Sequence, residues 1–146
     1  MKRLYIETYG CQMNVSDSEL MLGKLAAAGY VAVDTPNLAD VILLNTCAIR
    51  DHAEQRVIGR LGELKRAMKP GTVVGVAGCM AQRLGPELLD KARHVSLVIG
   101  PDGYRALPFF NETAPTEIYT PSRTRSSIRP RPSRKPSRRI ASAAKV

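Results

Sequence analysis

Apolar runs alternate with amphipathic stretches along the first hundred residues of the chain. The near-continuous aliphatic runs at residues 40–46, 72–77 and 95–99 have the composition and length of strands buried on both faces. Residues 3–9 predict a first strand, and residues 30–33 predict a short one. The pattern therefore indicates about four to five strands.

Stretches with helical spacing separate these strands. Ser16-Asp17-Ser18-Glu19 has the form of a capping box, so it predicts a helix with Ser16 as its N-cap that ends at Gly29. Residues 51–68 carry one apolar stripe at helical spacing, and Pro86 predicts the start of a third helix. Strands that alternate with helices predict the α/β fold class, a parallel sheet with flanking helices of the Rossmann or flavodoxin-like kind.

The candidate chemistry lies in three cysteines, because each follows a predicted strand. Cys11, Cys47 and Cys79 should then meet at the carboxyl edge of the sheet, where open α/β folds bind ligands. Three thiolates at one edge would bind a soft metal or an iron–sulfur cluster. The glycines before Cys11 and Cys79 would let the backbone approach such a ligand closely.

Other roles for these thiols stay open at this point. They can be three unrelated buried cysteines, since free cysteine often packs as a small hydrophobe. They can hold zinc with His52, His94, a carboxylate or water, although the chain has no CxxC pair. A single catalytic cysteine is a further alternative.

Composition narrows the class of protein. The chain has 146 residues, 44% of them hydrophobic, which suits one α/β domain. It contains no apolar run of roughly 18 residues and no secretory pattern, so we expect a cytoplasmic protein without a membrane partner. The sequence does not define the oligomeric state, and we favour a monomer. Three cysteines, an odd number, argue against a disulfide framework.

The net charge of +9 belongs to the end of the chain. Residues 1–121 hold 13 basic and 13 acidic side chains, whereas residues 122–146 hold nine basic and no acidic ones. We therefore expect a folded domain at residues 1–112 and a disordered Arg/Ser/Pro-rich tail at residues 113–146. This tail either contacts RNA phosphates or is incidental, out-of-frame sequence.

The residues around each cysteine carry a resemblance. Tyr9-Gly10-Cys11-Gln12-Met13-Asn14, Asn45-Thr46-Cys47-Ala48-Ile49-Arg50 and Gly78-Cys79-Met80-Ala81-Gln82 resemble the three cysteine motifs in the amino-terminal domain of radical-SAM methylthiotransferases. The resemblance covers about residues 3–110. It is closest to the branch that 2-methylthiolates isopentenyladenosine in tRNA, ahead of the branch that modifies a ribosomal protein.

The resemblance implies a cofactor and a set of ligands. Cys11, Cys47 and Cys79 would ligate an auxiliary [4Fe-4S] cluster with one open iron. By their positions beside these cysteines, Asn14 can orient a ligand or simply form the turn, and Arg50 can balance the charge of the cluster or be a solvated side chain at a helix start. The full-length enzymes of this family also use S-adenosylmethionine and a second cluster, and act on tRNA.

The chain departs from the family pattern after its third motif. No cysteine follows Cys79, so the radical-SAM motif CxxxCxxC is absent, and no RNA-binding domain follows. We therefore expect a truncated chain that binds a cluster without catalysing the reaction, and we assign no catalytic residue. A metal-free flavodoxin-like binding module remains an alternative, although the loop at residues 10–14 has a single glycine.

Overall fold

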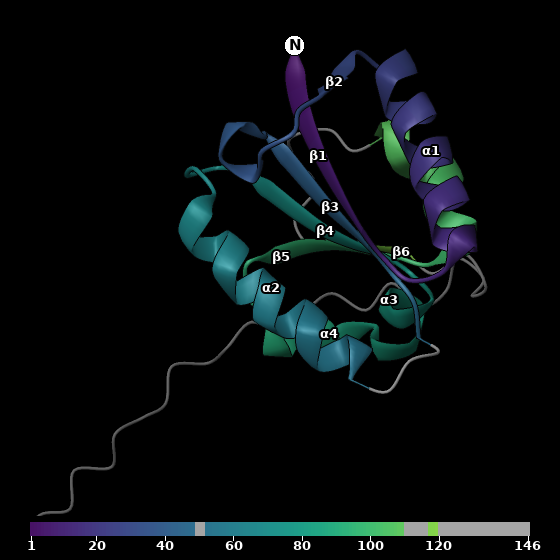
Figure 1. The fold of residues 1–146 in the computed structure, drawn as a ribbon, viewed down its shortest axis with the longest axis vertical. Helices are drawn as coiled ribbons and strands as arrows, with labels where there is room; N and C mark the ends of the chain where they lie inside the picture. The colour runs from purple at the N-terminus through teal and green to yellow at the C-terminus, as the bar shows by residue number, and fades with distance from the viewer. Residues whose placement is uncertain (49–51, 110–116, 120–146) are drawn as a thin grey trace, which may run out of the picture.

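One parallel sheet organises the molecule (Figure 1). The computed structural model describes residues 1–48, 52–109 and 117–119. Every neighbouring pair of strands runs parallel, in the order β2-β1-β3-β4-β5-β6, which confirms the predicted fold class. The strands are β1 (Lys2–Tyr9), β2 (Tyr30–Ala32), β3 (Val41–Thr46), β4 (Val73–Gly78), β5 (Val95–Ile99) and β6 (Glu117–Tyr119).

Helices cover both faces of this sheet, giving three layers. Figure 1 shows α1 and η2 on one face, and α2, α3 and α4 on the other. The helices are α1 (Gln12–Ala27), η1 (Pro36–Leu38), α2 (Ala53–Ala67), α3 (Cys79–Leu84), α4 (Pro86–Lys91) and η2 (Pro101–Phe109), where η marks a 3₁₀ helix. None of the helices in the described residues has the length and apolarity needed to cross a bilayer.

Each face has its own hydrophobic core, because successive strand residues point to opposite faces. The α2 face is built from aliphatic side chains of β3 and β4 together with α2, α3 and α4, among them Ile42, Leu44, Val57, Leu61, Val76, Met80 and Leu88. The α1 face is built from α1, η2 and the alternate strand residues, among them Leu4, Met21, Leu25, Leu43, Ala77, Ile99 and Tyr104.

The register of the central strands aligns their carboxyl ends, so that β1, β3 and β4 end side by side. Tyr9 of β1 lies opposite Thr46 of β3, and Thr46 lies opposite Gly78 of β4. Neighbouring strands in a sheet are about 4.8 Å apart. The residues that follow these three strands therefore leave the sheet side by side at one edge.

The start of α1 differs from the prediction. Ser16 is not its N-cap; the helix begins one turn earlier, at Gln12, with Cys11 in the cap position. The Cys11 sulfur and the Asn14 side chain cap the backbone reciprocally there. The predicted capping box was wrong because Ser16 lies inside α1, whose first turn is capped by Cys11 and Asn14.

Among the elements that were not predicted, two concern the cysteines or the end of the domain. The helix α3 starts directly at Cys79, so this cysteine opens a helix instead of lying in a loop. The strand β6 lies in the stretch from residue 113 for which we expected disorder, and it pairs with β5. The remainder of the predicted tail lies outside the described residues, so the boundary at residue 112 stays a prediction.

Candidate metal centre

The three cysteines lie where the strand register puts them. Cys11 follows β1, Cys47 follows β3, and Cys79 follows β4, and these strands are neighbours in the sheet. All three are free thiols. Cys11 and Cys79 are exposed, whereas Cys47 between them retains 7% of its accessible surface. The fold therefore places the residues that follow β1, β3 and β4 at one carboxyl edge, and the joint role of the three thiols as ligands stays a prediction.

Two glycines allow this close arrangement. A Cβ on Gly10 would stand 2.2 Å from Asn14 Oδ1 and 2.8 Å from Cys47 Cβ. Gly78 has a φ of 102°, and a Cβ there would stand 2.1 Å from the Thr46 carbonyl oxygen. Any side chain at either position would push the turns apart, so the glycines hold Cys11 and Cys79 close to the end of β3.

The first turn of α1 favours the thiolate of Cys11. The backbone amides of Met13 and Asn14 lower the pKa of this thiol, and the side chain of Cys47 adds to the shift. The Asn14 Oδ1 atom accepts from the Cys11 backbone N–H at 3.3 Å and lies 3.5 Å from Cys11 Sγ. This turn therefore favours the form of Cys11 that a metal would need, because thiolates and not thiols bind metals.

A buried network of neutral polar groups supports this turn from below. Asn45, fully buried on β3, donates through Nδ2 to the Asn14 backbone carbonyl at 2.7 Å and to Ser18 Oγ at 3.0 Å. Its Oδ1 accepts from Asn14 Nδ2 at 3.2 Å. Ser18 Oγ also shares a hydrogen bond with Thr8 Oγ1 at 2.7 Å. The network ties α1 to β1 and β3 immediately beneath the cysteines.

Sequence reasoning identified Asn14 as a neighbour of the site but missed the rest of this network. One signal was present: Asn45 interrupts an aliphatic run that reads as a buried strand, and a polar side chain in such a strand needs partners. The other candidate neighbour, Arg50, lies outside the described residues.

Tyr104 of η2 is a further residue at this edge that the sequence did not indicate. Its side chain is 3% exposed, and its hydroxyl is one of the buried polar atoms without a hydrogen-bond partner in the described residues. Burial raises the pKa of Tyr104, and the Asp17 side chain of α1 raises it further. Tyr104 therefore lies on the face of the sheet that α1 covers, in the same buried cluster as Met21 of α1 and Ile99 of β5.

The two histidines do not join the cysteines. His52 is exposed and precedes α2 with a positive φ of 70°. His94 directly precedes β5, at the amino edge of the sheet, and burial lowers its pKa. Within the described residues, no three His, Cys, Asp or Glu side chains converge closely enough to hold a single metal ion. Zinc bound by a histidine and these thiols therefore has no support in this arrangement.

The donor set nevertheless fits an iron–sulfur cluster. Cysteine thiolates are the usual protein ligands of such clusters. A four-iron core is larger than one ion, so its ligands stand further apart than the ligands of a mononuclear site. The edge also supplies backbone N–H groups at the starts of α1 and α3, which favour negative charge.

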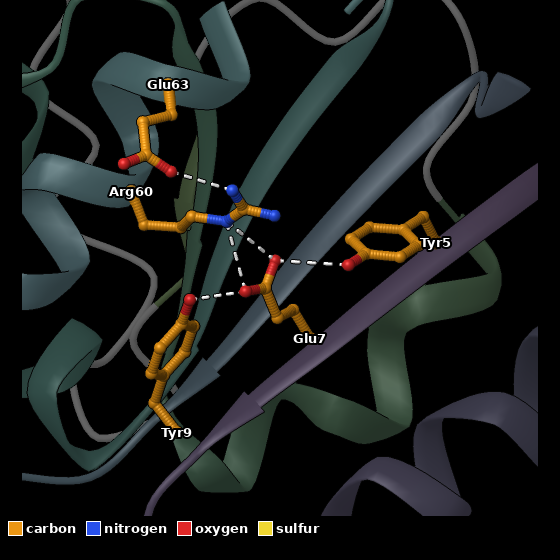
Figure 2. Close-up of polar contacts among 5 residues, drawn as sticks. All are labelled: Tyr5, Glu7, Tyr9, Arg60 and Glu63. Carbon is orange, nitrogen blue, oxygen red and sulfur yellow. Dashed lines mark hydrogen bonds and ion pairs between the residues drawn. The ribbon is translucent and has the colours of Figure 1, made fainter. Parts of the chain in front are cut away.

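The opposite face of β1 carries charged groups instead. Figure 2 shows Glu7 between Tyr5 and Tyr9, with Arg60 of α2 over its carboxylate. Arg60 Nε donates to both Glu7 oxygens at 3.1 Å, and its NH1 group donates to Glu63 at 2.7 Å. Both tyrosine hydroxyls donate to Glu7, so this cluster is saturated by its own members.

The fold and the site together define a parallel α/β domain that presents three free thiols at the carboxyl edge of its sheet. Residues 3–100 match the family described as uncharacterized protein family UPF0004, and the chain belongs to that family. The resemblance to the amino-terminal domain of methylthiotransferases, predicted from the cysteine motifs, is confirmed.

Individual relatives are about half identical to the chain. It is 50% identical over 108 residues to a protein of Chloroherpeton thalassium and 51% identical over 107 residues to one of Solibacter usitatus; each match covers 73% of the chain and 24% of the relative. A Ruegeria protein is 50% identical over 117 residues, 79% of the chain and 27% of the relative. All three are named tRNA-2-methylthio-N(6)-dimethylallyladenosine synthase. The chain thus spans about a quarter of the length of these relatives.

Proposed function

We propose that this chain is the cluster-binding domain of a tRNA methylthiotransferase, and that Cys11, Cys47 and Cys79 ligate a [4Fe-4S] cluster. The observation that supports this most is the level register of β1, β3 and β4, which delivers one thiol from each strand to the same edge. The names of the relatives supply the substrate class, a modified adenosine in tRNA.

The surroundings of the thiols suit a cluster with one iron free of protein ligands. Three cysteines leave one of four irons open. The exposed positions of Cys11 and Cys79 leave this side of the edge accessible to solvent, while Cys47 closes it below. Asn14 is the side chain that would orient a small ligand beside Cys11, since its Oδ1 already lies 3.5 Å from the sulfur.

The proposed division of labour separates binding from radical chemistry. In the full-length relatives, S-adenosylmethionine and a second cluster would generate the radical, and both lie outside what these 146 residues supply. The chain by itself is proposed to hold the auxiliary cluster in the cytoplasm and to transfer no methylthio group.

Anaerobic reconstitution tests this proposal. With iron and sulfide, the chain should take up about four irons and show the absorption and electron paramagnetic resonance spectra of a [4Fe-4S] cluster. Single Cys→Ala changes at 11, 47 and 79 should each abolish this uptake. Met13→Leu is the matched control, because it removes an exposed sulfur two residues from Cys11 and should leave the iron content unchanged.

Two results would overturn the proposal. One is a wild-type chain that takes up no iron and sulfide although circular dichroism shows it folded. The other is a full four-iron cluster in any one of the three alanine variants, which would remove that cysteine from the ligand set.

A further inference from the structure

We infer that Asn45 is a positioning residue for the cluster, because it fixes the Asn14 amide with its oxygen, and not its nitrogen, facing Cys11. This inference rests on the proposed function and deepens it. An acceptor held beside a ligand sulfur lowers the reduction potential of the cluster. Asn45 is not proposed as a ligand; it acts through Asn14.

Backbone groups at both ends of a chain of hydrogen bonds set the direction of the two amides. At one end, the Cys11 backbone N–H only donates, so the Asn14 atom that lies 3.3 Å from it is the oxygen. At the other end, the Asn14 backbone carbonyl only accepts, so the Asn45 atom that lies 2.7 Å from it is the nitrogen. The remaining contact, from Asn14 Nδ2 to Asn45 Oδ1 at 3.2 Å, then joins a donor to an acceptor.

Reversing either amide would break this match. Turning Asn14 alone would bring its nitrogen against the Cys11 N–H and its oxygen against Asn45 Oδ1. Turning Asn45 as well would bring its oxygen against the Asn14 carbonyl and withdraw the proton that Ser18 Oγ accepts at 3.0 Å. Asn14 and Asn45 are 4% and 0% exposed, so water does not replace the lost bonds. The direction of the Asn14 amide is therefore fixed.

The fixed oxygen has a defined effect on a bound cluster. Asn14 Oδ1 lies 3.5 Å from Cys11 Sγ, and a metal-bound thiolate has no proton to donate to it. Asn14 also accepts the Cys11 backbone N–H, which is thereby withheld from the sulfurs of the cluster. Hydrogen bonds to the sulfurs help to set the potential of an iron–sulfur cluster, and reduction adds one negative charge. An acceptor beside Cys11 and a withheld donor therefore both disfavour the reduced form.

Two substitutions test this inference on the chain reconstituted with iron and sulfide. Asn14→Leu removes the acceptor and frees the Cys11 N–H. Asn45→Leu keeps Asn14 but releases its amide, so that the Asn14 nitrogen can turn toward the sulfur. In each variant, the equilibrium constant for one-electron reduction should rise about tenfold, which corresponds to a midpoint potential higher by about 59 mV. Titration with dithionite, followed by electron paramagnetic resonance, measures this potential.

The double variant separates positioning from a purely structural role. Because Asn45 acts through Asn14, the chain that carries both Asn14→Leu and Asn45→Leu should have the potential of Asn14→Leu alone. Thr72→Val is the matched control. It removes another buried hydrogen bond, from Thr72 Oγ1 to the Ala39 carbonyl at 3.1 Å, just before β4 at the amino edge of the sheet. Its potential should equal that of the wild type.

A measurement on the cluster-free wild type tests the direction of the amide without any variant. In proton NMR spectra, the side-chain NH2 protons of Asn14 should show stronger nuclear Overhauser effects to the Asn45 side chain than to the Cys11 amide proton. The reverse order would overturn the inference, even if both leucine variants fail to fold.

The outcomes distinguish this inference from the proposed function. A wild-type chain that forms no cluster defeats the proposed function and the inference together. A wild-type cluster whose potential equals that of both leucine variants defeats the inference alone. A double variant whose shift in potential is the sum of the two single shifts also defeats it, because Asn45 would then act independently of Asn14.

Discussion

The two faces of β1 satisfy their polar groups in opposite ways. On the α2 face, Glu7 and Arg60 form an ion pair within a set of five polar side chains (Figure 2). On the α1 face, Thr8 and Ser18 begin a network of hydroxyls and amides that leads to the cysteines and contains no charged group. The charged set lies along the strand, and the neutral set lies under its carboxyl end.

On the proposed function, this difference suits a site for an anionic group. A carboxylate beneath the cysteines would repel thiolates, and a cation there would form an ion pair with them before any cofactor arrived. Neutral amides and hydroxyls fix the geometry of the turn without either effect. The charges of β1 are directed to the other face, where Arg60 neutralises Glu7.

The largest loss of stability should come from adding a side chain at Gly78, where the turn after β4 packs directly against the end of β3. Gly78→Ala places a Cβ against the Thr46 carbonyl and forces alanine into a φ of 102°. We expect the free energy of unfolding to fall by about 3 kcal/mol, measured by urea unfolding of the cluster-free chain. Gly62→Ala, at an open helix position, should instead stabilise by about 0.5–1 kcal/mol. Equal responses would show that the edge is not tightly packed.

Disrupting the hydrogen-bond network around Asn45 should cause the next largest loss of stability. Asn45→Leu removes three hydrogen bonds and leaves the buried Asn14 Nδ2 group without its Asn45 acceptor, whereas Ser18 keeps its bond with Thr8; the change should cost about 2–3 kcal/mol. The same variant should lose iron faster after reconstitution. Thr46→Val, which removes one hydrogen bond to the Ala77 carbonyl, should cost only about 1 kcal/mol. An Asn45→Leu chain as stable as the wild type would show that the network contributes no net stability.

The charged face should tolerate change better. The side chains of Glu7 and Arg60 are 22% and 30% exposed, so Glu7→Gln should cost about 1 kcal/mol, and less at high salt. Its iron content should stay at the wild-type level, in contrast to Asn45→Leu. Glu63→Gln, which changes a more exposed partner of Arg60, should cost less than about 0.5 kcal/mol. Loss of the cluster in Glu7→Gln would contradict the separation of the two faces.

The smallest expected effect is a pH dependence of the free energy of unfolding, caused by His94. Burial lowers the pKa of His94, helped by the charge of Lys65, so the unfolded chain binds a proton more readily than the folded chain. The contribution to stability is complete above the unfolded pKa of about 6.5 and is lost as pH falls through the lower folded pKa. His94→Gln should flatten the stability profile below pH 6.5, whereas His52→Gln should leave its slope in place. An unchanged slope in His94→Gln would refute this assignment.

The central strands were predictable because a strand that is buried on both faces consists of consecutive aliphatic residues. Aliphatic runs located β3, β4 and β5 to within a residue or two, and the cysteines after β3 and β4 then fell at one edge by topology alone. The helix α2 followed equally well from its apolar stripe.

The local starts of helices were harder to predict. Cysteine is not among the residues that usually mark an N-cap, so the start of α1 at Cys11 could not be recognised, whereas Ser16 is a usual N-cap residue inside the helix. The six-residue helix α3 is too short to show a period, and Gly78 at its N-cap read as a turn. In both cases the backbone is set by contacts with the end of β3, which lies far away in sequence.

The supporting residues of the site were not predictable for the same reason. Asn45 meets Asn14 across 31 positions of sequence, and only the folded sheet brings them together. Tyr104 belongs to η2, a 3₁₀ helix that was not predicted from the sequence. The ligand set itself was suggested by the cysteine motifs, and its role remains a proposal.

The order of the strands has a consequence for biogenesis. A nascent chain that has left the ribosome only as far as β3 offers two thiols, and the third appears when β4 joins β3. On the proposed function, iron and sulfide would therefore be delivered after the amino-terminal half has folded. A cluster bound at that stage would cross-link β1, β3 and β4 and hinder their separation. Loss of the cluster in oxidising conditions would therefore destabilise the central strands of the sheet and not its edge strands.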